Sequence, residues 1–102
     1  MFTILEPLQT EALGLADPGT AWRDARDGRT AREGALPVNV SGGLKAKGHP
    51  IGASGLAQAV ELYRQLTDDA GPRQVEPVPE LGVACNVGGF GNAVVVSLFE
   101  RR

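Results

Sequence analysis

Apolar residues recur at helical spacing in two stretches of the chain. In residues 51–66 they form one stripe, made of Ile51, Ala53, Leu56, Ala57, Val60, Tyr63 and Leu66. Such a stripe predicts an amphipathic helix that buries this face. Residues 3–14 show the same spacing and end at Gly14, which predicts a second helix with Pro7 in its first turn.

Two later runs are short, apolar and rich in β-branched residues, as buried strands are. They are LGVAC at 81–85 and NAVVVSLFE at 92–100, and the intervening NVGGFG predicts a hairpin turn. An extended segment is predicted at 36–40, and a short helix at Thr20–Asp27, in which Trp22 is expected to anchor packing. This order of elements predicts an α/β fold, with a mixed sheet and helices packed on it.

Length and composition narrow the class of protein. A chain of 102 residues is expected to form at most one domain, spanning 1–102. The net charge of −2 and scattered basic residues give no case for nucleic acid, and no apolar run approaches the roughly 18 residues that cross a membrane. A single cysteine, a single histidine and no recognisable secretory leader favour a cytoplasmic protein without a metal site.

Eight of the 14 glycines lie in two clusters, one around the only histidine and one beside the only cysteine. His49 lies between Gly48 and Pro50, directly before the predicted helix, where the helix dipole favours a neutral ring. Such a ring can act as a general base or as a hydrogen-bond donor to a carbonyl oxygen. Alternatively, His49 is a solvent-exposed or an N-terminal capping side chain. Cys85 ends the first predicted strand, either as a small buried hydrophobe or as a reactive thiol beside flexible backbone N–H groups.

Taken together, the two clusters resemble the C-terminal end of thiolases. The matching segments are NVSGGLKAKGHPIGASG and ACNVGGFGNAVVVSLFE, and the GHPIGASG match is highly specific. The segment FTILEPLQTEALGL is similar to the helix that leads this half-domain in the acetyl-CoA acetyltransferase branch, so the resemblance covers residues 2–102. It implies a partial thiolase-like half-domain whose N-terminal strand or strands are missing.

The resemblance also implies roles for individual residues. His49 matches the histidine that activates the nucleophilic cysteine and lines an oxyanion hole, and Cys85 matches the cysteine that shuttles a proton to and from the substrate α-carbon. The backbone N–H of Val87 matches a donor of the second oxyanion hole. Asn86 departs from the acetyltransferase pattern towards the sterol-carrier-like branch, which leaves the subgroup open. The supporting loop residues are Gly48, Pro50, Asn86, Gly88 and Gly89.

The cysteine that carries the acyl group in thiolases has no counterpart here, because Cys85 is the only cysteine. The resemblance therefore implies a C-terminal fragment that is inactive alone and works with an N-terminal thiolase half or in a homo-oligomer. The implied reaction is Claisen condensation or thiolysis of acyl-CoA, with coenzyme A as part of the substrate and no separate cofactor.

Two other interpretations stay open. The segment NVGGFGNAVVV also resembles the glycine turn of β-ketoacyl synthases, so the chain could be a remnant of one. Alternatively, it is a non-catalytic interaction module that pairs with another chain, such as a small OB-fold partner. Neither glycine cluster matches a phosphate-binding motif.

Overall fold

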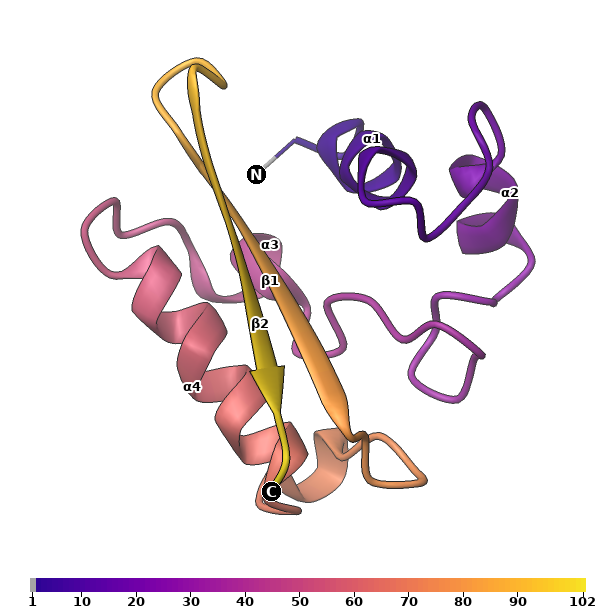
Figure 1. Cartoon of the computed structure of the whole chain (residues 1–102), viewed down its shortest axis with the longest axis vertical. Helices are drawn as coiled ribbons and strands as arrows, with labels where there is room; N and C mark the ends of the chain where they lie inside the picture. Colours follow the sequence, from indigo (N-terminus) through magenta and orange to yellow (C-terminus); the bar gives the residue numbers. More distant parts are fainter. Residues whose placement is uncertain (1) are drawn as a thin grey trace. The chain divides into compact units, whose positions relative to one another are not determined.

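The computed structural model describes residues 2–102, which fall into two units, one ending at Val40 and one spanning Ser41–Arg102 (Figure 1). The first contains helices α1 (Leu5–Ala12) and α2 (Ala21–Arg26). The second contains α3 (Gly43–Lys47), α4 (Ser54–Leu66), a 3₁₀ turn (Gly71–Arg73) and strands β1 (Leu81–Gly88) and β2 (Ala93–Glu100). The α/β class is confirmed, and the two strands form an antiparallel sheet.

In the first unit, a carboxylate of α1 joins the two helices. Glu11 accepts a hydrogen bond of 3.1 Å from the backbone N–H of Ala21, the first residue of α2. Backbone N–H groups of Gly19 and Ala21 hold the pKa of Glu11 below its ordinary value. Because the first N–H groups of a helix have no partner within it, Glu11 caps α2 from a distance.

The extended segment predicted at 36–40 does not become a strand, so that prediction is wrong. The N–H groups of Leu36 and Val38 donate instead to the carbonyls of Arg29 and Thr30, both at 3.0 Å. Pro37 between them has no N–H to donate to a ladder, and Asn39 has a φ of 49°, which ends the extended path.

Trp22 is half exposed, so the prediction that it anchors packing is also wrong. Its indole N–H donates to the Gly19 carbonyl at 3.1 Å, and the guanidinium carbons of Arg23 and Arg26 lie 5.2 and 5.3 Å from the ring centroid. The ring is therefore held by local polar and cation–π contacts.

The second unit confirms the predicted hairpin. The register runs from Leu81 opposite Glu100 to Gly88 opposite Ala93, so β1 continues three residues beyond the predicted 81–85. The turn is correspondingly shorter than NVGGFG. Gly89 and Gly91 have φ values of 59° and 93°, a region that glycine enters without strain.

Helix α4 packs mainly against β1, with small residues at the closest approach. A Cβ built on Gly82 would lie 2.9 Å from Leu62 Cδ2, and one built on Gly55 would lie 3.1 Å from Asn86 Nδ2. The predicted apolar stripe is not the face that α4 buries here, because Leu56 and Tyr63 are 71% and 64% exposed. The prediction that α4 buries this stripe is therefore wrong for these two residues.

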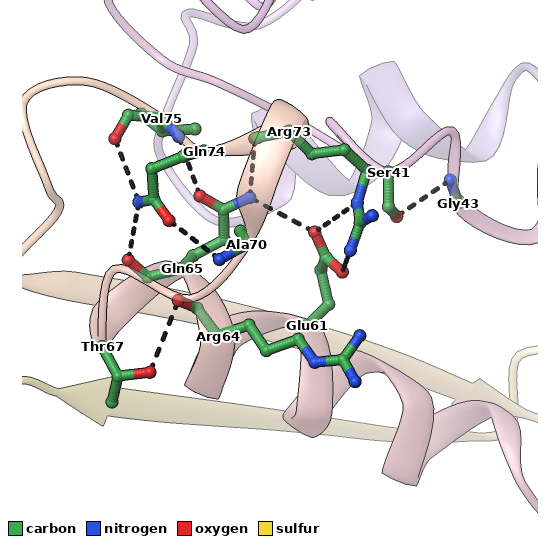
Figure 2. Close-up of polar contacts among 10 residues, drawn as sticks. All are labelled: Ser41, Gly43, Glu61, Arg64, Gln65, Thr67, Ala70, Arg73, Gln74 and Val75. Atoms are coloured by element: carbon green, nitrogen blue, oxygen red, sulfur yellow. Dashed lines mark hydrogen bonds and ion pairs between the residues drawn. The ribbon is translucent and has the colours of Figure 1, made fainter.

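A network of side chains ties the end of α4 to the segment that follows it (Figure 2). The buried Gln65 amide donates to the Arg73 carbonyl and accepts from the Val75 N–H, both at 2.9 Å. Arg73 in turn pairs with Glu61 at 3.0 Å. The Gln74 amide donates to the Gln65 carbonyl at 2.9 Å, one of the last carbonyls of α4, which have no partner within the helix. Together these contacts hold the segment that leads into β1.

Candidate active site

His49 follows α3 in a short connection to α4. Gly48 before it has φ 83° and ψ 178°, a conformation almost restricted to glycine, which explains the residue at this position. The helix starts at Ser54, slightly later than predicted, and His49 itself is exposed. Its Nδ1 atom lies 2.8 Å from the hydroxyl of Ser54, which is only 3% exposed.

The Ser54 hydroxyl orients the His49 ring through Nδ1. When this hydroxyl donates its single proton to the Pro50 carbonyl at 3.1 Å, its oxygen accepts a hydrogen bond from Nδ1–H of the imidazole at 2.8 Å. In the neutral ring the other nitrogen, Nε2, then carries the free lone pair. A histidine held in this way presents Nε2 as a base.

Cys85 lies within β1 and is partly buried. Gly82, Ala84 and Asn86 are on the face of the hairpin that meets α4. Because side chains alternate along a strand, the Cys85 thiol is on the opposite face, with Val83 and Val87. The thiol therefore belongs to the face of the sheet that points away from α4.

The hydrogen bonding of the hairpin shows which backbone groups of β1 are available. Arg101 N–H donates to the Glu80 carbonyl at 2.9 Å, which makes this a hydrogen-bonded pair one step before Leu81 and Glu100. Such pairs alternate along an antiparallel ladder, so Cys85 and Val87 belong to non-hydrogen-bonded pairs. Their N–H and C=O groups point to the free edge of β1, and the Val87 N–H is not used by β2.

The first turns of α4 bring the two glycine clusters to the same end of the helix (Figure 1). Ser54 holds His49, while Gln58 donates from Nε2 to the Cys85 carbonyl at 3.1 Å. Residues four apart lie on the same helix face, about 6 Å apart along the axis. Within residues 2–102, no hydrogen bond joins His49 directly to Cys85.

The remaining predicted loop residues shape this end of the hairpin. The Asn86 amide lies over Gly55, where a larger side chain would meet it. Gly88 closes the ladder opposite Ala93, and Gly89 begins the turn. Pro50 supplies the carbonyl that receives the Ser54 hydroxyl and also the N–H groups of Ala53 and Ser54.

Three residues at this end of α4 were not singled out in the sequence: Ser54, Gly55 and Gln58. Gln58 is a polar residue between Ala57 and Ala59 in an apolar run, which is the one signal that could have found it. Ser54 follows His49 by five residues within the GHPIGASG segment, but neither periodicity nor spacing marks it as the partner of the histidine.

A hollow of about 220 Å³ lies between α4 and the hairpin. Gln58, Asn86, Ser97 and Phe99 are among the residues that line it, and neither His49 nor Cys85 does. Across residues 2–102, no three or more histidine, cysteine or carboxylate groups gather where they could hold a metal ion. Nor is any helix in this part of the chain long and apolar enough to cross a membrane.

The sequence profile described as thiolase C-terminal domain-like matches residues 1–101. The chain belongs to this family. An acetyl-CoA acetyltransferase from Methanothermobacter thermautotrophicus is 48% identical over 100 residues, 98% of this chain and 26% of that protein.

Two other relatives show how widely this segment is used. Bovine sterol carrier protein 2 is 43% identical over 97% of this chain and 18% of its own length. Benzoylsuccinyl-CoA thiolase subunit BbsB from Thauera aromatica is 41% identical over 86% of this chain and 23% of its own length. The chain thus spans about a quarter or less of these relatives.

Proposed function

We propose that this chain supplies the base and the proton-shuttling thiol of a thiolase-type acyltransferase that acts on acyl-CoA. The observation that carries the proposal is the anchoring of His49 and Cys85 on adjacent turns of α4, through Ser54 and Gln58. A neutral imidazole with a free Nε2 and a cysteine thiol are groups suited to successive proton transfers in acyl transfer.

The proposed roles follow from the groups available at each position. Nε2 of His49 withdraws the proton from an acyl-accepting cysteine in the other half of the enzyme. Cys85, as the thiolate, removes a proton from the α-carbon of the acetyl group, and as the thiol it returns one. The Val87 N–H at the free edge of β1 is positioned to donate to a thioester oxygen that gains negative charge.

This division of roles makes the isolated chain inactive. Cys85 is its only cysteine and is assigned to the proton shuttle, so no group is left to carry the acyl chain. The partner we propose is an N-terminal thiolase half, or another copy in a homo-oligomer, and a small OB-fold protein is a further candidate. A free shuttle thiol also requires a reducing compartment, which favours the cytoplasm.

A chimera tests the proposal. The matching C-terminal segment of the Methanothermobacter acetyl-CoA acetyltransferase is replaced by this chain, and thiolysis of acetoacetyl-CoA is measured. We expect activity in the chimera and none in the isolated chain. His49→Ala or Cys85→Ala in the chimera lowers kcat/KM by about 10²–10⁴-fold, the usual contribution of general acid–base groups.

Matched variants complete the design. Thr67→Ala removes an exposed hydroxyl at the other end of α4 and leaves the rate unchanged. Thiolysis by the isolated chain that disappears on His49→Ala would overturn the proposed division of roles. A folded chimera whose rate is indifferent to both His49 and Cys85 would overturn the assignment of the site.

A further inference from the structure

Within residues 2–102, Gln58 makes the hydrogen bond that joins α4 to the hairpin. Its Nε2 donates to the carbonyl of Cys85 at 3.1 Å in a partly buried position. A carbonyl only accepts, so the amide orientation is settled by this contact, and Nε2 rather than Oε1 faces Cys85.

The Cys85 carbonyl, which accepts from Gln58, makes no hydrogen bond to β2. Cys85 stands opposite Val96 in a non-hydrogen-bonded pair, so its C=O points to the free edge of β1. The N–H on the other side of the same peptide belongs to Asn86, whose pair with Val95 is hydrogen-bonded. This peptide is therefore held from both sides, by α4 and by β2.

Gln58 is poorly suited to a purely stabilising role. Its Oε1 atom is buried and has no hydrogen-bond partner among the described residues. A buried acceptor without a partner costs free energy, whereas an apolar side chain of the same length would fill the space without that cost. The Nε2 atom thus keeps its hydrogen bond to Cys85, although burying Oε1 without a partner costs free energy.

We infer that Gln58 is a positioning residue, which fixes the Cys85 thiol relative to His49 by holding the Cys85 carbonyl on the helix that also holds the histidine. The inference rests on the proposed function, since it assumes that His49 and Cys85 serve one site. Ser54 and Gln58, one turn apart on α4, then set the positions of the base and the thiol as a unit.

The test uses the whole chain, which contains one cysteine and one histidine. A nitroxide label on Cys85 broadens the NMR signals of nearby protons, and the His49 ring signals are unique. We expect the label to broaden them in the unsubstituted chain. In Gln58→Met the extent of this broadening changes, the ¹³C resonance of the unlabelled Cys85 carbonyl shifts, and the melting temperature changes little.

Gln65→Met is the matched control, because Gln65 is a buried amide on the same helix that contacts only the segment after it and Glu61. It lowers the melting temperature and leaves both the His49 broadening and the Cys85 carbonyl shift unchanged. Gln58→Glu keeps the shape of the side chain without its N–H, and behaves like Gln58→Met.

The outcomes distinguish the role of Gln58 from the shared site of His49 and Cys85. If the label broadens His49 equally in Gln58→Met and in the unsubstituted chain, the inference about Gln58 is overturned and the proposed site stands. If His49 is not broadened in the unsubstituted chain, the shared site itself fails. Loss of the folded state in both Gln58 variants would overturn the inference, because Gln58 would then be structural.

Discussion

His49 takes its orientation from Ser54, a residue of the helix that follows it, and not from any side chain of the hairpin. Ser54 is buried, and when its hydroxyl proton is on the Pro50 carbonyl, the hydroxyl oxygen acts on the imidazole as an acceptor. The sequence motif around His49 predicted a base but not the group that selects its tautomer. That group matters because only Nε2 is exposed to a reacting partner.

Ser54→Ala is expected to cost about 1 kcal/mol of unfolding free energy, the typical net value of a hydrogen bond. Without this acceptor the ring proton no longer prefers Nδ1, so the population of the tautomer protonated at Nε2 rises. The ¹⁵N spectrum of the single histidine measures this change directly. Thr67→Ala, which removes a hydroxyl bonded to the Tyr63 carbonyl, leaves the histidine spectrum as it was; an unchanged spectrum in Ser54→Ala as well would contradict the assigned tautomer.

At the scale of elements, hydrophobic periodicity predicted both longer helices, and β-branched runs predicted the hairpin. Periodicity failed to say which face of α4 is buried against the hairpin. That face depends on Gly55, Gly82 and Leu62, because two small residues let the helix approach the strand. The apolar stripe around Leu56, Val60 and Tyr63 is left exposed in this unit. Spacing identifies an apolar face but not the partner that covers it.

Two further elements lay beyond sequence reasoning for local reasons. Helix α3 covers only Gly43–Lys47 and begins in a glycine pair, so helix propensity argues against it. The segment 36–40 has strand-like residues, but Leu36 and Val38 find acceptors in Arg29 and Thr30 instead of a neighbouring strand. In the site, the same limit applies to Gln58, whose target is set by the register of the hairpin.

Gly82→Ala tests the close approach of α4 and β1. The added Cβ would lie 2.9 Å from Leu62 Cδ2, which forces the leucine or the helix to move. We expect a loss of about 1–2 kcal/mol in urea unfolding, the usual cost of overpacking. Gly52→Ala is the control, since its Cβ would meet nothing within 4 Å, and it should leave the midpoint unchanged. Equal midpoints for the two variants would show that the approach is not tight.

The end of α4 should make stability depend on pH through Glu61. Burial raises the pKa of Glu61, but hydrogen bonds from Arg73 and Gln65 and the charges of Arg73 and Arg64 outweigh it, so the pKa lies below its ordinary value of 4.5. The folded protein therefore binds fewer protons than the unfolded chain near this pH. The stabilisation is complete above about pH 4.5 and is lost as the pH falls through the lower folded value.

Glu61→Gln is expected to lower the urea midpoint at neutral pH and to converge with the unsubstituted chain in acid. Unfolding curves recorded between neutral pH and pH 3 measure the difference. Glu100→Gln, an exposed carboxylate on β2, controls for net charge and should leave the pH dependence intact. A constant offset for Glu61→Gln at every pH would mean that its contribution is not electrostatic.

At the scale of the whole chain, very little apolar surface is fully buried. Among the residues described, only Ala21, Leu66 and Ala70 are buried hydrophobics. On the hairpin face away from α4, Val94, Val96 and Leu98 are 55%, 48% and 68% exposed, and the Cys85 thiol lies on this same face. Large contiguous apolar surfaces mark contacts with another partner. Because the Cys85 thiol lies on this surface, a partner that covers the surface would also contribute to the site.

The isolated chain is therefore expected to self-associate and to bind a hydrophobic dye, and sedimentation velocity with dye fluorescence measures both. The double variant Val96→Thr/Leu98→Thr removes apolar surface from the open face, so it should reduce association and dye binding with little loss of stability. Leu66→Ala is the opposite control, because Leu66 is 4% exposed and its truncation costs about 2–5 kcal/mol. A monomeric unsubstituted chain that binds no dye and melts cooperatively would contradict this expectation, since its exposed apolar faces would then need no partner.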